Sequence, residues 1–409
     1  MPNLVGLFLI TVLATAAGAQ TLARPGWVGS GMSSAPWWKR PVVYRADPRL
    51  FGGLHGLAEH MDYVHSLGVD ALLVSAPGKE AKQPVDPTLG TMDDFDEIVR
   101  RASQYGIRVL AELKPQDDLN ASPRMWLVHG VAGFYAPGAS SAQIATIRHA
   151  ASGLGGQQRI VIADLAALDT QNTHGGDAPQ LVVDPRAAGQ DKLTAESVRS
   201  GLEATQILAD QGRTMPLMIS DAPGMKRSFT RFGDGTNDNA IAKLTATILL
   251  MTRASAMLFS GQELGLADTQ TSIVFGEPKT GEQPPPGTEA AGNASGSSLL
   301  NWYRQLIALD HSNPTLAHGA ATLLNHDDQN IVAWVRRPAS SSQATPPIVV
   351  VANLTGKPIT VSLKADIQRL HLRGSFLRTV LRTDNAMGAM HLDGMTLEPY
   401  MVFIGELRY

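Results

Sequence analysis

The feature that most constrains this chain is a regular alternation, beginning after residue 40, of short apolar runs and longer stretches of helical period. The short runs are rich in β-branched residues and have the length of strands. The longer stretches repeat apolar residues every three or four positions, which predicts amphipathic helices. We expect strands at 41–44, 71–75, 108–113, 131–135, 159–163, 180–183, 216–220 and 256–260, and helices at 54–66, 92–105, 142–153, 195–211, 239–251 and 298–310.

This alternation predicts an α/β fold of the (β/α)8 TIM barrel type. Eight strand repeats over roughly 270 residues match the ~250 residues that are typical of such barrels. A doubly wound sheet is the alternative, and the even count and the length favour the barrel. One helix carries clear end signals, because Thr91 precedes two acidic residues at its start and Gly106 suits the left-handed position after its end.

The rhythm changes beyond about residue 316, where short apolar runs alternate with turns. We expect strands at 331–335, 348–351, 359–363 and 400–404. Closely spaced short strands of this kind predict a small C-terminal antiparallel β-sandwich. Before it, residues 275–297 contain GEQPPPGTEAAGNASGS, which predicts a flexible excursion ahead of the last barrel helix.

Composition excludes several classes of function. The net charge of −3 gives no electrostatic reason to expect nucleic acid as a partner, and the absence of cysteine removes disulfides and thiolate chemistry. His55, His60 and His65 are spaced five apart, which does not keep one helix face, so no metal site is expected. No phosphate-binding or dinucleotide fingerprint is present, and we expect no cofactor.

The N-terminus has the form of a secretory signal. Residues 4–14 are an apolar run, and Ala17-Gly18-Ala19 fits the small-x-small cleavage pattern, so residues 1–19 are predicted to be removed. The run lacks a preceding Lys or Arg, which leaves an uncleaved anchor as the alternative. No later segment is apolar for the ~18 residues that a membrane helix needs, so we expect no transmembrane segment after signal removal. The predicted location is periplasmic or extracellular.

Long stretches of the chain resemble the α-amylase family of retaining α-glucoside hydrolases. WWKRPVVYRADPRLF (37–51) looks like the first strand of that family's barrel, and VDPTLGTMDDFDEIVRRASQYGIRVLAELKP (85–115) is similar to its second helix and third strand. MLFSGQELGL (257–266) resembles the eighth strand. The resemblance implies a barrel over 36–315 and a β-sandwich over 316–409. The segment between strands three and four is too short for the calcium-binding subdomain that many relatives insert there.

The catalytic motifs of the family are altered in this chain. In the segment GVAGFYAPG (130–138), the resemblance places Pro137 where the family has its nucleophilic Asp and Tyr135 where it has an Arg. Asp164 stands where the family has the Glu that acts as acid and base. Proline offers no carboxyl group, and a tyrosine supplies no cation to keep a carboxylate ionised. We therefore do not expect the standard family chemistry.

Several acids remain at predicted strand ends, where barrel active sites lie. Asp164 is the first candidate for a general acid, with a cap for the following turn as its alternative role. Asp221 follows the seventh strand, where a turn before Ala-Pro-Gly is the simpler interpretation, and Glu112 and Asp117 follow the third strand as weaker candidates.

Two aromatic residues are candidates for substrate binding. Tyr44, near the first strand, has packing at the barrel entry as its alternative role, and Tyr135 stands at the end of the fourth strand.

Two functions therefore stay open. The first is an exported, catalytically degenerate member of the α-amylase family that acts in carbohydrate metabolism by binding an α-glucan, such as a maltooligosaccharide, or a protein partner. The second is an active α-glucan hydrolase or transglycosylase with relocated carboxylates, in which Asp164 is the general acid. Fold alone does not choose between them, because barrels host many chemistries.

Overall fold

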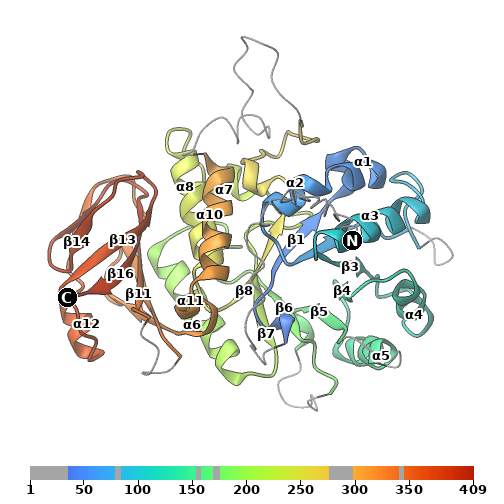
Figure 1. The fold of residues 1–409 in the computed structure, drawn as a ribbon, viewed down its shortest axis with the longest axis horizontal. Helices are drawn as coiled ribbons and strands as arrows, with labels where there is room; N and C mark the ends of the chain where they lie inside the picture. Colours follow the sequence, from blue (N-terminus) through green and yellow to red (C-terminus); the bar gives the residue numbers. More distant parts are fainter. Residues whose placement is uncertain (1–35, 79–83, 153–157, 169–175, 276–297, 340–344) are drawn as a thin grey trace, which may run out of the picture. The chain divides into compact units, whose positions relative to one another are not determined.

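The computed structural model describes residues 36–78, 84–152, 158–168, 176–275, 298–339 and 345–409 (Figure 1). Eight parallel strands form a closed barrel, in which each strand pairs with the next along the chain and the eighth pairs with the first. The expected barrel is confirmed, and the doubly wound alternative is wrong. The strands are β1 (Val42–Ala46), β2 (Ala71–Val74), β3 (Arg108–Glu112), β4 (Gly133–Ala136), β5 (Ile160–Asp164), β6 (Leu181–Asp184), β7 (Met215–Met218) and β8 (Ser255–Phe259).

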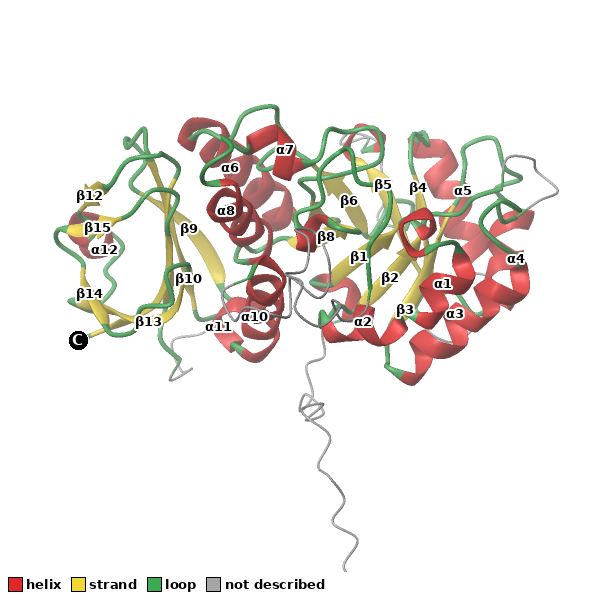
Figure 2. Cartoon of the chain, turned by 90° about the horizontal axis from the view of Figure 1, so that it is seen from above, coloured by secondary structure: helices red, strands yellow, loops and turns green. Residues whose placement is uncertain are grey.

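Helices pack around the outside of this barrel (Figures 1 and 2). The helix expected over 54–66 is two helices that meet at His60, whose backbone leaves the helical region. Residues 113–132, between β3 and β4, contain one short helix, so no inserted subdomain separates these strands. The helices are α1 (Leu54–Glu59), α2 (Met61–Ser66), α3 (Met92–Gln104), α4 (Ala121–Val128), α5 (Ser141–Ser152), α6 (Ala195–Gln211), α7 (Ser228–Phe232), α8 (Asp238–Leu250), α10 (Leu299–Ser312) and α11 (Pro314–His318).

The barrel strands are apolar on both faces because both faces are covered. Val43 and Leu73 belong to one buried cluster, whereas their sequence neighbours Tyr44 and Leu72 belong to another. Side chains of a strand alternate between its two faces, and strands of a parallel sheet are buried on both. This is why the sequence shows near-continuous apolar runs at these positions.

The end signals of α3 form as the sequence predicts. The Thr91 hydroxyl accepts a hydrogen bond from the backbone of Asp94, and the Asp94 carboxylate accepts one from the backbone of Thr91. Gly106, just beyond the helix, has a φ of 74°, which glycine adopts without strain.

A buried carboxyl group ties the start of the barrel to its end. Glu263 lies in the turn after β8 and is fully buried. Its Oε1 accepts hydrogen bonds from the hydroxyl groups of Tyr44, at 2.7 Å, and Tyr63, at 2.6 Å. Burial raises the pKa of both phenols well above their usual value, and the nearby Glu263 adds to the effect. Burial also raises the pKa of Glu263 itself. The contact joins β1, α2 and the turn after β8.

The C-terminal part is antiparallel, as expected. A six-stranded sheet has the order β14-β13-β16-β11-β10-β9, and a two-stranded sheet pairs β12 with β15. One apolar cluster includes residues of both sheets and of the helix α12 (Lys364–Arg369). The strands are β9 (Ala320–Leu324), β10 (Ile331–Arg337), β11 (Ile348–Asn353), β12 (Ile359–Val361), β13 (Phe376–Arg382), β14 (Ala389–His391), β15 (Met395–Leu397) and β16 (Val402–Arg408).

The larger sheet is joined to the barrel by buried hydrogen bonds from β10. The indole nitrogen of Trp334 donates to the Met251 carbonyl at 2.9 Å. The guanidinium of Arg336, which is fully buried, donates to the backbone carbonyls of Thr252, Leu316 and Gly319. Barrel and sheet residues share one apolar cluster, so the division of the chain at residue 316 stays a prediction.

The described part of the chain contains no helix long and apolar enough to cross a membrane. The predicted signal over 1–19 and the excursion predicted over 275–297 lie outside the described residues, apart from Phe275 at the edge of the latter.

The phenols on Glu263 predict a loss of stability at high pH. A phenol whose pKa is raised in the folded state keeps its proton there, while the unfolded chain loses it above pH ~10. The free energy of unfolding should therefore fall above pH 10, by about 1.4 kcal/mol per pH unit for each such phenol. Urea unfolding at pH 9, 10 and 11 measures this slope.

The variant Tyr63→Phe should show a shallower slope, whereas Tyr409→Phe, which removes a phenol that is 78% exposed, should leave the slope unchanged. An equal slope in the wild type and in Tyr63→Phe would contradict the assignment.

Candidate functional site at the barrel mouth

The barrel mouth is defined here as the carboxyl ends of the eight strands, where active sites of this fold lie. A network of five side chains lies at the mouth. Four of them come from the last two residues of β1, β3, β4 and β5, and the fifth comes from the residue that follows β2. These side chains are Arg45, Ser75, Glu112, Tyr135 and Asp164.

A buried ion pair spans β1 and β3. Arg45 Nη2 lies 2.7 Å from Glu112 Oε2, and the two side chains are only 7% and 11% exposed. The Ser75 hydroxyl donates to the same oxygen at 2.6 Å. Glu112 therefore has a cation and a hydroxyl as fixed partners. Sequence reasoning missed Arg45, because its partner is 67 residues away and no local pattern marks it.

Asp164 holds the end of β4. Its Oδ1 accepts a hydrogen bond from the Tyr135 hydroxyl at 2.7 Å, and its Oδ2 accepts one from the backbone N–H of Gly138, also at 2.7 Å. Burial, and then the neighbouring Asp164, raise the pKa of the Tyr135 phenol. The Arg45 guanidinium lies over the Tyr135 ring at 5.0 Å and connects this pair to Glu112.

Pro137 lies in the turn that follows β4. Gly138, next in the chain, has a φ of 71°, a left-handed conformation that glycine adopts at little cost. The hydrogen bond from Gly138 to Asp164 fixes this turn. At the position that the resemblance assigns to a nucleophile, the chain therefore presents a tethered turn without a carboxyl group.

Asp221 lies in the loop after β7 and contacts the start of α7. It is 3% exposed, and its carboxylate accepts hydrogen bonds from both the backbone N–H and the hydroxyl of Ser228, the first residue of α7. Burial raises the pKa of Asp221, and the hydrogen bonds from Ser228 oppose that shift. A raised pKa would suit a general acid, but the exposure leaves almost no surface that a substrate could reach.

The remaining acids on β3 and β6 are engaged locally. Asp117 Oδ2 accepts a hydrogen bond from the backbone N–H of Lys114 at 2.8 Å, which is a turn contact. Asp184, at the end of β6, is fully buried and is paired with Arg186 and with the Thr205 hydroxyl. Its carboxylate also accepts a hydrogen bond from the Arg186 backbone N–H at 3.1 Å, which is a turn contact.

The two aromatic candidates for substrate binding are both covered. Tyr44 is fully buried, and its hydroxyl is used by Glu263. Its assignment to substrate binding needs correction, because no ring face is left for a sugar. Tyr135 is at the mouth but only 4% exposed, since Arg45 covers its ring.

The structure thus brings Glu112, Tyr135 and Asp164 into one network through Arg45, while Asp117 and Asp221 serve their own turns. Among the described residues, no three His, Asp or Glu side chains are grouped so as to hold a metal ion. The network can hold the mouth rigid and can present polar atoms at its surface. Each candidate acid accepts a hydrogen bond from the protein itself.

The ion pair at the mouth predicts a large penalty when it is broken. Arg45→Ala leaves the Glu112 carboxylate with little solvent and no cation, and should lower the free energy of unfolding by about 3–5 kcal/mol. The double variant Arg45→Met/Glu112→Gln is neutral at both positions and keeps an acceptor for Ser75, so it should recover at least half of that loss. Urea unfolding measures both, and an Arg45→Ala loss below about 1 kcal/mol would contradict a buried pair.

Sequence comparisons find relatives over part of the chain. A 96-residue segment is 36% identical to trehalose-6-phosphate hydrolase of Escherichia coli K12, and covers 19% of this chain and 17% of that protein. A 129-residue segment is 28% identical to the amino acid transporter heavy chain SLC3A2 of Mus musculus, and covers 24% of each. These alignments therefore span less than a quarter of the relatives' lengths. No protein-family profile matches the chain.

Structural comparison extends the likeness to nearly the whole chain. The fold superposes on trehalose-6-phosphate hydrolase of Bacillus licheniformis with a TM-score of 0.75 and 14% identity, covering 92% of this chain and 100% of that one. An isomaltulose synthase from Klebsiella superposes with a TM-score of 0.73 and 17% identity, covering 91% of this chain and 100% of that one. At these identities the likeness concerns the fold. The resemblance to the α-amylase family is therefore confirmed, by sequence over about a fifth of the chain and by fold over nearly all of it.

Proposed function

We propose that this protein is an exported, non-catalytic member of the α-amylase family, which acts by binding a partner at its barrel mouth. The observation that carries the proposal is the tether between Asp164 and the Pro137–Gly138 turn. The residue that matches the family's acid and base holds the turn that has replaced its nucleophile. Export, the binding role and the loss of catalysis are all parts of this proposal.

The chemistry of the mouth supports the loss of catalysis. A retaining glycosidase needs two carboxyl groups about 5–5.5 Å apart, one of which attacks the sugar. Pro137 supplies none, and both oxygens of Asp164 already accept hydrogen bonds from Tyr135 and Gly138. A general acid must hold a proton and direct it at the leaving oxygen, which these two contacts oppose.

The same residues favour a protein over a glucan as the partner. Sugar rings are held by stacking on exposed aromatic faces, but Tyr44 is fully buried and Tyr135 is 4% exposed. The mouse relative is named as the heavy chain of an amino acid transporter. That relative supports a role for an α-amylase-like chain as the partner of another protein.

An active enzyme with relocated carboxylates is the alternative, because other relatives are named as hydrolases and glucosidases. In that case Asp164 would be the general acid and Glu112, Asp117 or Asp221 its partner. The contacts made by Arg45 to Glu112 and by Ser228 to Asp221 weigh against it.

A hydrolysis assay separates the two functions. The full chain, Asp164→Ala and the control Asp393→Ala, which removes a 68% exposed carboxylate of the C-terminal part, are incubated with maltooligosaccharides and with an aryl α-glucoside, and released sugar and phenol are measured. We expect no release above the buffer blank from any of the three, because Pro137 offers no carboxyl group at the position of the nucleophile. Turnover in the wild type and in Asp393→Ala that disappears in Asp164→Ala would contradict the proposal and favour the enzyme.

The same variants test the structural role of Asp164. Asp164→Ala leaves the Tyr135 hydroxyl and the Gly138 N–H without their acceptor, so it should lower the free energy of unfolding by about 1–3 kcal/mol.

Calorimetry of the full chain with maltooligosaccharides tests whether the partner is a glucan or a protein. Saturable heat of binding would favour a glucan over a protein as the partner.

A further inference from the structure

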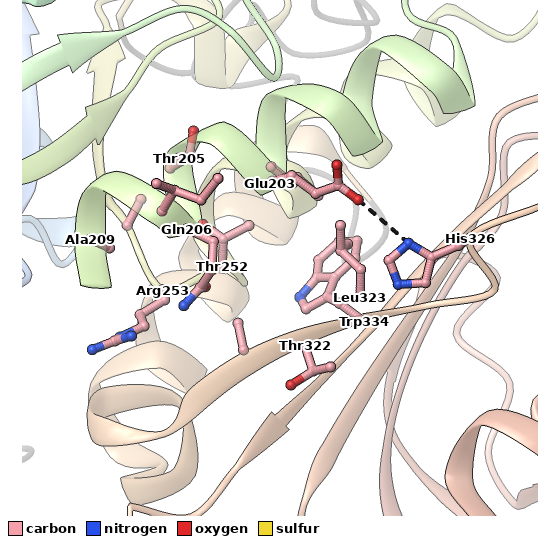
Figure 3. Close-up of a pocket in the computed structure, with 14 residues that line it drawn as sticks. Glu203, Thr205, Gln206, Ala209, Thr252, Arg253, Thr322, Leu323, His326 and Trp334 are labelled. Atoms are coloured by element: carbon pink, nitrogen blue, oxygen red, sulfur yellow. Dashed lines mark ion pairs between the residues drawn. The ribbon is translucent and has the colours of Figure 1, made fainter. Parts of the chain in front are cut away.

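A cavity of about 320 Å³ lies on the side of the barrel, between α6 and the first two strands of the larger C-terminal sheet (Figure 3). None of its lining residues is Arg45, Ser75, Glu112, Tyr135 or Asp164, the residues of the network at the barrel mouth. Its size is at the lower end of the range of about 300–1,000 Å³ that small-molecule sites occupy. It is lined by Leu202, Glu203, Thr205, Gln206, Ile207, Ala209, Thr252, Arg253, Ala254, Ala321, Thr322, Leu323, His326 and Trp334.

Small side chains keep this cavity open. Ala209 on α6, Ala254 before β8 and Ala321 on β9 line it from three different elements. Larger apolar residues at these positions would fill the space, as they do elsewhere in a close-packed interior. Leu323 and Trp334 stand at the centre of the lining in Figure 3 and supply its broad apolar wall.

The polar groups around the cavity are already bonded within the protein. Gln206 Nε2 donates to Asp210 Oδ1 at 3.1 Å, and the Arg253 guanidinium pairs with the same carboxylate. At the other end, Glu203 Oε1 lies 3.4 Å from His326 Nδ1, the pair marked by the dashed line in Figure 3.

The hydroxyl groups in the lining are engaged as well. Thr205 donates to Asp184 at 2.8 Å, and Thr322 accepts from the Arg337 guanidinium at 3.2 Å. The indole N–H of Trp334 is used by the Met251 carbonyl. The surface that faces the cavity is therefore mainly carbon, and the polar side chains at its two ends contact one another or Asp210.

We propose that this cavity is a binding site for a neutral, largely apolar small molecule. The polar side chains at both ends already have partners in the protein, which disfavours a charged ligand, because its lost hydration would not be replaced by a free polar group. The volume disfavours a helix of another protein, whose diameter with side chains is about 10–12 Å. Ile207 on α6 is 63% exposed at the lining, and a bound apolar molecule would remove part of that side chain from water.

The site is independent of the function proposed for the barrel mouth. It depends on the packing of α6 against β9 and β10, and none of its lining residues belongs to the network of Arg45, Glu112 and Asp164. Its test therefore succeeds or fails without regard to hydrolysis or to partner binding.

The neutral fluorescent probe N-phenyl-1-naphthylamine tests the proposal with the full chain. Its fluorescence rises in apolar surroundings, so a titration reports binding. We expect saturable binding with one site per chain. Ala321→Phe places a ring in the cavity and should weaken binding at least tenfold, while Ala389→Phe, at an exposed alanine of β14 in the same sheet, should leave the affinity unchanged.

Urea unfolding of each variant shows that the comparison is between folded proteins, and Ala321→Leu replaces Ala321→Phe if the larger ring prevents folding. A loss of binding in a cavity-filled variant that unfolds at the wild-type urea concentration supports the site. Absence of saturable binding in the wild type would overturn the proposal. Equal affinity in the wild type and the cavity-filled variant would overturn it too, since the probe would then bind elsewhere.

Discussion

A carboxylate that is removed from water needs a hydrogen-bond or charge partner. This requirement determines the contacts of the acidic side chains at the barrel mouth. Glu112 is paired with Arg45, Asp164 with Tyr135 and the Gly138 backbone, and Asp221 with the first residue of α7. These contacts tie β1, β3, β4 and β5 to one another and set the start of α7. These three acids therefore connect separate elements of the fold.

The turn at Pro137 and the contacts of Asp164 are physically linked. A carboxyl group that acts as acid and base has to face the substrate, so its oxygens cannot be fully used by the protein. At Pro137 the chain turns without a carboxyl group, and the N–H of Gly138 is directed at Asp164. Tyr135, at the position of the family's cation, fills the space with a ring and donates its hydroxyl. Tyr135, Gly138 and Asp164 thus form an arrangement in which both oxygens of the Asp164 carboxylate have a donor within the protein.

Much of the fold could be predicted because the signals are local. Each of the eight barrel strands lies within two residues of its expected position, since strands buried on both faces leave continuous apolar runs. Thr91 and the two acidic residues in the first turn predict the start of α3. Weak signals were missed: α4 and α7 are short, β9 and β13 to β15 lack strong alternation, and the break at His60 has no breaker residue.

The site was less predictable, because its contacts join distant parts of the chain. Asp164 was identified from its position, but its partners Tyr135 and Gly138 lie 29 and 26 residues away. No local sequence pattern marks Arg45 as a site residue, because its partner Glu112 lies on another strand. Tyr44 carried an aromatic ring at a strand near the mouth, and only the packing shows that the ring faces inward, toward Glu263.

We propose that the barrel mouth forms no covalent bond with a sugar, because Pro137 stands at the position that the resemblance assigns to the nucleophile. Intact mass spectrometry after incubation with a fluorinated α-glucosyl fluoride, a reagent that traps the glycosyl-enzyme intermediate of retaining α-glucosidases, tests this directly. We expect the mass of the protein to stay unchanged after prolonged incubation. A gain of one fluoroglucosyl group, located by peptide mapping at a mouth carboxylate such as Glu112 or Asp164, would contradict it.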